Sequence, residues 1–145
     1  MWFLNSDDAG CSKWDSNYGQ NFHFPIQGPT TIHFSDDWTD QVAGALASGQ
    51  TFVVDYDIRR LASCRADYSG YDAWTVQAVY RFDGGAISYA PLTEKIDMVH
   101  NGPIPAVLAA PAGAHQVEMW FENNDADGCD AYDSQYGQNY VFDLQ

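Results

Sequence analysis

An acidic loop near the C-terminal end of the chain offers oxygen ligands at the spacing that calcium sites use. Asn123, Asp125 and Asp127 alternate along the chain and a glycine follows them, as at the start of a D-x-D-x-D-G calcium loop. Calcium takes six to eight oxygen ligands, and further carboxylates lie a few residues downstream. The sequence therefore predicts a candidate Ca²⁺ site formed by Asn123, Asp125, Asp127, Asp130 and Asp133.

Two features leave a purely structural role open for this loop. Ser134 stands at the twelfth position, where calcium loops of this kind carry a bidentate Glu. Asp and Asn side chains in turns also cap their own backbone without any ion. A solvated polar turn is therefore the alternative to a calcium site.

The acidic loop belongs to a segment that occurs twice. Residues 1–26 and 119–144 align without a gap and are identical at fourteen positions. Each copy is predicted to form a strand, an acidic glycine-containing loop and a second strand, so we expect two equivalent hairpins. In the first copy Ala9 replaces a potential ligand, which makes its loop the weaker calcium candidate. The buried faces are expected to include Met1, Phe3, Phe24, Met119, Phe121 and Phe142, and the exposed faces Trp2 and Trp120.

The composition excludes several classes of partner. The 145 residues carry a net charge of −14, with only six Lys and Arg. Nucleic acids and anionic membrane surfaces attract clustered cations, so both are unsuitable partners. No stretch approaches the ~20 apolar residues of a membrane span. The N-terminus has no basic region and no sustained apolar run, so no signal peptide is predicted. Localisation stays open, and Met1 lies inside the repeat, which is consistent with a piece excised from a longer protein.

The three cysteines do not form an even set. Cys11 and Cys129 occupy the same position of the repeat, and Cys64 stands outside it. An odd count fits neither a disulfide framework nor a zinc site of four ligands. Small unpaired thiols are expected, and a Cys11–Cys129 bridge stays open if the hairpins are neighbours.

The elements that position these residues are mostly strands. Apolar and polar residues alternate over 52–59, 74–82, 117–122 and 140–144, and a DGG turn at 83–85 predicts a hairpin. An N-cap, a stripe of apolar residues four apart and a glycine predict one short helix near 37–48. Three prolines break up 101–114, which is predicted to be a loop with at most a short edge strand. We therefore predict a single all-β domain, an antiparallel two-sheet β-sandwich of the Ig-like kind.

A nine-residue segment in each repeat resembles a known family motif. Residues 14–22, WDSNYGQNF, are similar to the W-D-N/S-N-x-G-x-N-Y motif of family 21 carbohydrate-binding modules, the starch- and glycogen-binding β-sandwiches. Residues 132–140, YDSQYGQNY, match with two changes, and the strand before them is also similar to that family's. Two departures are the second copy of the motif and the long acidic loop in place of a short turn. The resemblance supports the sandwich better than it supports the ligand.

The resemblance implies a sugar site on these segments. A pyranose presents an apolar C–H face to an aromatic ring and a rim of hydroxyls to amides and carboxylates. By resemblance the ligand-binding residues are Trp14, Asn17 and Asn21 in the first copy, with Tyr132 and Asn139 as a weaker counterpart. The alternative is that the aromatic residues belong to the core and the Asn residues to turns.

Catalytic patterns are not visible in the sequence. The four histidines are scattered, without metal-ligand spacing, and no nucleophile elbow or phosphate loop occurs. A pair of acid residues distant in sequence stays open, as in glycosidases. The sequence therefore predicts a non-catalytic module, and the resemblance implies that this module binds an α-glucan or another neutral glycan. The alternatives are a calcium-stabilised structural or adhesion domain that self-associates through its terminal hairpins, and an acidic protein that neutralises a basic partner.

Overall fold

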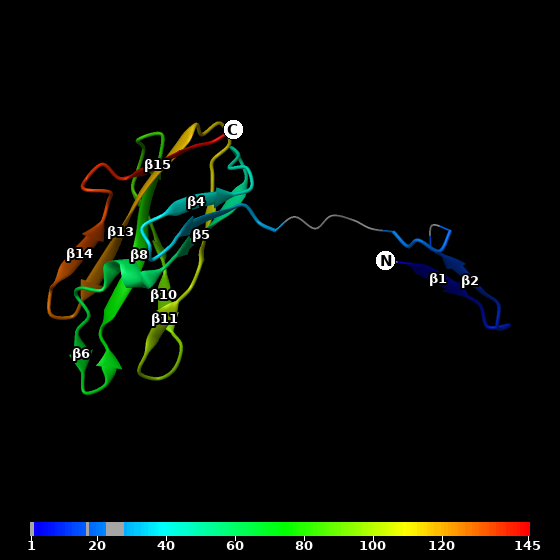
Figure 1. The fold of residues 1–145 in the computed structure, drawn as a ribbon, viewed down its shortest axis with the longest axis horizontal. Helices are drawn as coiled ribbons and strands as arrows, with labels where there is room; N and C mark the ends of the chain where they lie inside the picture. The colour runs from blue at the N-terminus through cyan, green and yellow to red at the C-terminus, as the bar shows by residue number, and fades with distance from the viewer. Residues whose placement is uncertain (1, 17, 23–27) are drawn as a thin grey trace.

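A computed structural model describes residues 2–16, 18–22 and 28–145, and its main body is a sandwich of two β-sheets (Figure 1). The smaller sheet has the strand order β12-β5-β3-β4 and the larger one the order β14-β13-β8-β9, with β15 also paired to β13. The prediction of an all-β sandwich is confirmed. The sheets are antiparallel apart from one pair, because β3 and β5 run parallel.

The bounds of the elements follow the two sheets. The smaller sheet contains β3 (Thr31–Phe34), β4 (Asp40–Ala43), β5 (Thr51–Tyr56) and β12 (Ala106–Ala109). The larger sheet contains β8 (Trp74–Phe82), β9 (Ser88–Pro91), β13 (Gln116–Asp125), β14 (Asp130–Asp133) and β15 (Tyr140–Asp143). Three two-stranded ribbons add β1 (Phe3–Ser6) with β2 (Ser12–Asp15), β6 (Asp67–Tyr68) with β7 (Tyr71–Asp72), and β10 (Thr93–Lys95) with β11 (Asn101–Pro103).

The core lies between the sheets because their strands alternate in burial. In β13 every second residue from Val117 to Asn123 is buried, and β5 alternates in the same way from Phe52 to Tyr56. Successive side chains of a strand point to opposite faces, so this pattern turns one face of each sheet inward. Phe34 contacts Phe121 across the core, with ring centroids 4.6 Å apart in an edge-to-face arrangement.

The helix expected near 37–48 is not present, and this prediction was wrong. The Asp37 carboxylate instead accepts hydrogen bonds from the backbone N–H and the hydroxyl of Thr39, and Trp38 has a left-handed φ of 67°. This side-chain-to-backbone bonding competes with a helix and turns the chain into β4. The helical element of the sandwich is the 3₁₀ turn η1 (Ile58–Leu61), which begins where the Asp57 carboxylate accepts the N–H of Arg59. Residues 101–114, expected to be mostly loop, contain β11 and the edge strand β12.

The two terminal repeats have different surroundings. The C-terminal copy contributes β13, β14 and β15 to the sandwich, whereas β1 and β2 form a hairpin that stands apart from it in Figure 1. Every residue of β1 and β2 is exposed. Phe3 was expected to be buried and is 52% exposed, because the hairpin has no sheet packed on its inner face. Trp2 is exposed as expected, Trp120 and Phe142 are half-buried, and Met1 and Phe24 lie outside the described residues.

Within the described part of the chain, the helical elements are too short or too polar to cross a membrane.

Candidate functional site

A buried ion pair joins the C-terminal hairpin to the turn η1. Arg60 Nε lies 2.9 Å from Asp133 Oδ2, and both side chains are almost fully buried. Tyr56 and Tyr140 donate their hydroxyl protons to the two carboxylate oxygens of Asp133, at 3.0 and 2.6 Å. Arg60 also donates to the Tyr140 hydroxyl at 2.6 Å. Further hydrogen bonds make a buried charge pair tolerable, and here the two tyrosine hydroxyls satisfy the carboxylate, whereas Arg60 Nε faces Asp133 without a well-aligned hydrogen bond.

The aromatic rings around Arg60 complete this cluster. The guanidinium carbon lies 4.9 Å from the centroid of the Trp38 ring and 5.4–5.6 Å from those of Phe34, Tyr56 and Tyr140. These distances are in the range of cation–π attraction. Burial is the main reason that the pKa values of Tyr56 and Tyr140 lie well above that of free tyrosine, and the Asp133 charge adds to it. Both hydroxyls therefore stay protonated and keep donating to Asp133.

Two further connections attach the hairpin to the segment that follows η1. The buried Asn123 amide donates to the backbone carbonyl oxygens of Leu61 and Ser63, at 3.3 and 2.6 Å. Cys64 and Cys129 form a disulfide between residues 65 apart in sequence. The expectation of unpaired thiols was therefore wrong for these two, and the Cys11–Cys129 bridge left open does not occur, because Cys129 is already paired. Cys11 is an exposed free thiol.

A groove of about 590 Å³ opens over the buried ion pair. Exposed aromatic side chains border it on two sides, Trp38 from the turn before β4 and Tyr132 from β14. Tyr136 projects into solvent from the loop between β14 and β15, where its φ of 58° and the following Gly137 form the turn. Asp40 and Gln135 supply polar groups at the same groove. The groove thus combines flat apolar surfaces with hydrogen-bonding groups, as small-molecule sites do.

The residues predicted from the family resemblance are divided between the two ends of the chain. Tyr132 is 57% exposed and borders the groove. Asn139 is half-buried, has a φ of 59°, and donates to Glu118 at 2.7 Å, so it also holds the turn. Trp14 is exposed on β2, and Asn21 has the same left-handed φ of 59° as Asn139. Asn17 lies outside the described residues.

The predicted calcium ligands are not gathered at one point. Asn123 and Asp133 face the core, where they bond to the groups already described. Asp125 accepts the backbone N–H groups of Asp127 and Cys129 at 3.0 Å, which closes the turn. Asp127 accepts the Tyr68 hydroxyl at 2.5 Å, and Asp130 accepts the Asn124 amide at 2.6 Å. Another group of metal-type ligands, Cys64, Asp125 and Cys129, has its two sulfurs joined in the disulfide.

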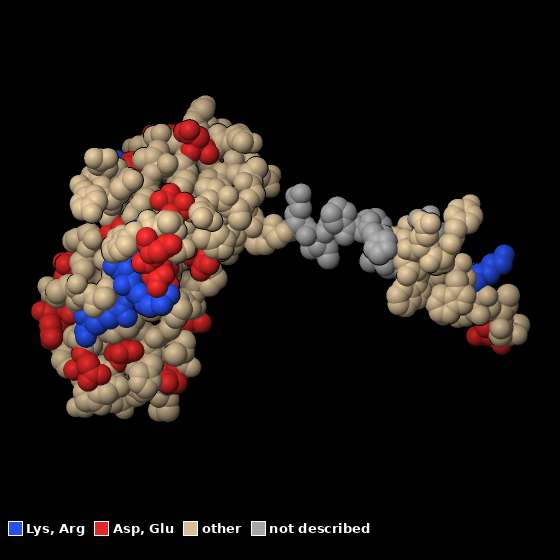
Figure 2. All heavy atoms as spheres, viewed as in Figure 1, with Lys and Arg blue, Asp and Glu red and all other residues tan. Residues whose placement is uncertain are grey.

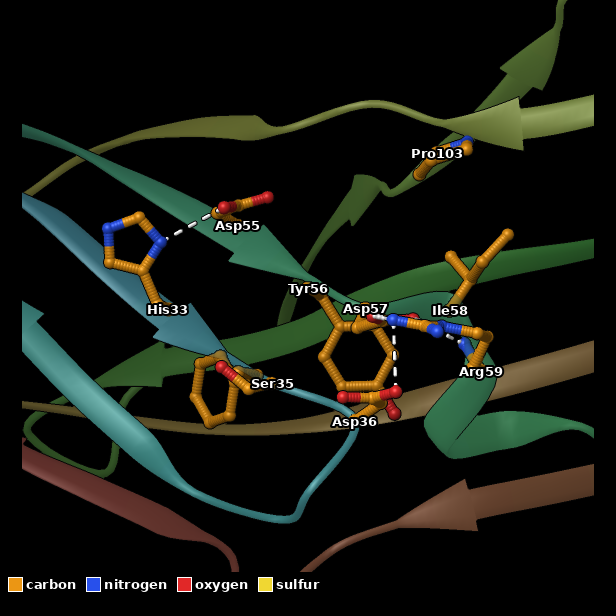
Figure 3. A pocket seen from close by; sticks show the side chains of 10 residues that line it. His33, Ser35, Asp36, Asp55, Tyr56, Asp57, Ile58, Arg59 and Pro103 are labelled. Atoms are coloured by element: carbon orange, nitrogen blue, oxygen red, sulfur yellow. Dashed lines mark hydrogen bonds and ion pairs between the residues drawn. The ribbon is translucent and has the colours of Figure 1, made fainter.

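A second hollow, of about 580 Å³, lies beside η1 and is shown in Figure 3. Its charged groups are paired with one another: His33 with Asp55 at 3.0 Å, and Arg59 with Asp36 at 3.0 Å and with Asp57. On the face of the sandwich drawn in Figure 2, most basic atoms gather near η1 and acidic atoms lie around them. Exposed pairs of this kind contribute little to stability, and their charged groups already bond one another. The aromatic groove is therefore the stronger candidate for a ligand.

Sequence reasoning missed Trp38, Tyr136 and Arg60 as members of the site. Trp38 was assigned to the apolar stripe of a helix that does not form, and Tyr136 lay within the second copy of the motif without being named as a ligand-binding residue. Arg60 follows an alternating strand in a chain with only six Lys and Arg, and that rarity was the available signal. Its pairing with a residue 73 positions away depends on tertiary packing.

The fold and this groove define a class: an all-β sandwich domain whose C-terminal hairpin is attached to its core by an ion pair and a disulfide. The chain belongs to the DUF6209 family, a family of unknown function, whose model matches residues 1–145. No curated protein and no solved structure matches the chain.

Proposed function

We propose that the sandwich is a non-catalytic carbohydrate-binding module for an α-glucan or another neutral glycan. The observation that carries the proposal is the groove bordered by the exposed rings of Trp38, Tyr132 and Tyr136. Aromatic rings stack on the apolar face of a pyranose, and Asp40 and Gln135 are placed to bond its hydroxyls. The net charge of −14 favours a neutral ligand over an anionic one.

Replacing one aromatic residue of the groove tests this proposal. Affinity electrophoresis through gels that contain soluble glucans measures retardation of the wild-type chain. Tyr132→Ala should lose the retardation without a change in melting temperature, because the ring is exposed and its loss leaves the core intact. Tyr89→Ala is the matched control, since Tyr89 is equally exposed on β9 and lies outside the groove.

Two results would remove the proposal: no glucan retards the wild-type chain, or Tyr132→Ala and Tyr89→Ala behave alike. Trp14→Ala tests the first copy of the motif in the same gels. If Trp14 binds sugar by itself, its loss reduces retardation while the groove stays intact.

A calcium-stabilised structural or adhesion domain is the second candidate, favoured by the exposed hairpin β1–β2, which has the form of a contact element. Calcium at a hundred times its dissociation constant would stabilise the fold by about 2.7 kcal/mol. A thermal melt in millimolar calcium and then in chelator measures this. An unchanged melting temperature rejects the metal part of the candidate.

A further inference from the structure

The N-terminal hairpin has the same local structure as the C-terminal one. The register pairs Phe3 with Asp15 in the first hairpin and Phe121 with Asp133 in the second, positions that are 118 residues apart. In both loops one Asp accepts two backbone N–H groups, at 3.0 and 2.9 Å for Asp7 and at 3.0 Å for Asp125. The ring contact is also repeated, with centroids 5.8 Å apart for Phe3–Phe22 and 5.9 Å for Phe121–Tyr140.

Four of the residues that attach the C-terminal hairpin to the sandwich recur in the N-terminal hairpin, and a fifth, Tyr140, is replaced by Phe22, which lacks the hydroxyl that bonds Arg60 and Asp133. We call the acceptor surface the seat; it consists of Phe34, Tyr56, Arg60, Leu61, Ser63 and Cys64, which contact Phe121, Asn123, Cys129 and Asp133. The equivalents of those four hairpin residues are Phe3, Asn5, Cys11 and Asp15, identical in type.

Most of the residues that face away from the seat are not repeated, and the exception is Trp120, which matches Trp2. Glu122, Asn124, Asp130 and Tyr132 correspond to Leu4, Ser6, Ser12 and Trp14. Over the paired residues 3–6 and 12–15, the identical positions are those that face the seat, whereas a requirement for the hairpin shape alone would not favour one face. Ala131 is the inward exception: it is half-buried, and its equivalent is Lys13, whose long side chain can reach solvent from such a place.

The N-terminal hairpin therefore presents four of the groups that bind the seat, at a place away from the seat of its own sandwich. Phe3 is 52% exposed where Phe121 is fully buried, and Cys11 is free where Cys129 is bonded. The seat of its own sandwich is occupied by the C-terminal hairpin, through a disulfide. Exposed apolar surface of this kind marks an interaction site.

We propose that the N-terminal hairpin closes a second sandwich body of this same fold, one that lacks its own closing hairpin. The hairpin would add β1 to the edge of that body's sheet, place Asp15 against an arginine equivalent to Arg60, and bond Cys11 to a cysteine equivalent to Cys64. Addition of strands to an open sheet edge is a known mode of recognition. The proposal deepens the subunit-contact candidate by naming the partner, and it is independent of glycan binding at the groove.

The covalent step is a thiol–disulfide exchange. The Cys11 thiol and the partner thiol each lose one proton and one electron, and oxidised glutathione takes up both to become two molecules of reduced glutathione. The sulfur–sulfur bond of the oxidant breaks as the bond between the two cysteines forms. The hairpin loop and the seat hold the corresponding pair of sulfurs together in the sandwich described above.

An extended chain tests the proposal directly. A second copy of residues 28–118, which lacks the closing hairpin, is fused in front of Met1. Met1 then follows residue 118 of the added copy in the same way that Met119 follows residue 118 in the natural chain. After folding in a glutathione redox buffer, the free thiols are titrated with a chromogenic disulfide reagent. The wild-type chain has one free thiol, that of Cys11, and we expect the extended chain to have none. A peptide map should then show Cys11 joined by a disulfide to the cysteine of the added body.

A matched pair of variants separates seating from chance pairing of thiols. Asp15→Asn removes the charge that would meet the seat arginine, and Asp8→Asn removes one charge from the exposed loop of the same hairpin. The first should restore the Cys11 thiol in a large fraction of molecules, and the second should not. Lys13→Ala, which matches Ala131, should increase the yield of the bond if the lysine hinders seating.

Four outcomes would overturn the proposal. Cys11 stays titratable in the extended chain and in its Lys13→Ala form, or the added body stays unfolded while the original sandwich melts normally, or Asp15→Asn and Asp8→Asn give the same yield. Dimers of the intact wild-type chain that Phe3→Ser abolishes would also overturn it, because they would make a second complete copy the partner. Glycan retardation of the extended chain is measured separately, so failure of one proposal is distinguishable from failure of the other.

Discussion

The two hairpins of this chain share local structure and differ in almost everything that surrounds it. Both have the same strand register and a loop in which one Asp side chain accepts hydrogen bonds from the loop backbone. Both also have left-handed backbone conformations at equivalent tyrosines, with φ values of 57° at Tyr18 and 58° at Tyr136. Yet β1 and β2 are exposed along their whole length, whereas alternate residues of β13 are buried.

The comparison separates what a short sequence determines from what tertiary packing determines. Turn residues with left-handed φ and an Asp that bonds its own loop act within a few residues, so both copies form the same hairpin. The burial of Phe121, the ion pair of Asp133 and the disulfide of Cys129 all require the seat on a distant part of the chain. Equal residues in the two hairpins should therefore have unequal effects on stability.

The largest difference is expected at the paired aspartates. Asp133→Asn leaves the buried Arg60 without its countercharge and should cost about 3–5 kcal/mol of unfolding free energy. Asp15→Asn, at an exposed position, should change it by less than about 0.5 kcal/mol. Denaturant unfolding of the two variants measures both. Equal losses would mean that the N-terminal hairpin is packed in solution.

The phenylalanines provide a second and similar contrast. Phe121→Ala removes a fully buried ring from the centre of the core and should cost about 3–5 kcal/mol. Phe3→Ala removes an exposed ring, and the midpoint of its denaturant curve should stay near that of the wild type. A loss above 1 kcal/mol from Phe3→Ala, on the order of a buried contact, would contradict the contrast.

The cysteines should give the smallest of the three differences. Cys64→Ser opens the disulfide and should lower the free energy of unfolding by about 2–4 kcal/mol, because the closed loop is long. Cys11→Ser should leave it unchanged, since that thiol is exposed and unpaired. Thermal melts with and without a reducing agent provide the check: reductant should lower the melting temperature of Cys11→Ser and not that of Cys64→Ser.

The parts of the structure that follow from periodicity were predictable. Alternation placed strands at β5, β8 and β13, and the DGG turn placed the β8–β9 hairpin, so the sandwich followed. The region of Trp38 was mispredicted because its apolar residues are four apart, while Asp37 bonds Thr39 and breaks the helix. The disulfide was missed because an odd number of cysteines argues against a disulfide framework, and the pairing of two cysteines 65 residues apart depends on tertiary packing.

The candidate site was predictable only in part, for the same physical reason. Tyr132 belongs to a motif that can be recognised in the sequence, and its side chain borders the groove. Trp38 reaches that groove from the turn before β4 and Arg60 from η1, so their roles arise from the way the two sheets pack together. The parallel pairing of β3 with β5 is likewise a property of the topology and leaves no trace in alternation.

The Cys64–Cys129 disulfide has a mechanical consequence. Its two cysteines are 65 residues apart, and a fully extended chain gains roughly 3.5 Å per residue, so about 230 Å of contour cannot be drawn out while the bond is intact. A pull on the two ends of the chain would lengthen only the residues before Cys64 and after Cys129. In a force-extension experiment the segment between the two cysteines should not contribute to the contour length of the unfolded chain. A reducing agent should add that length by opening the disulfide.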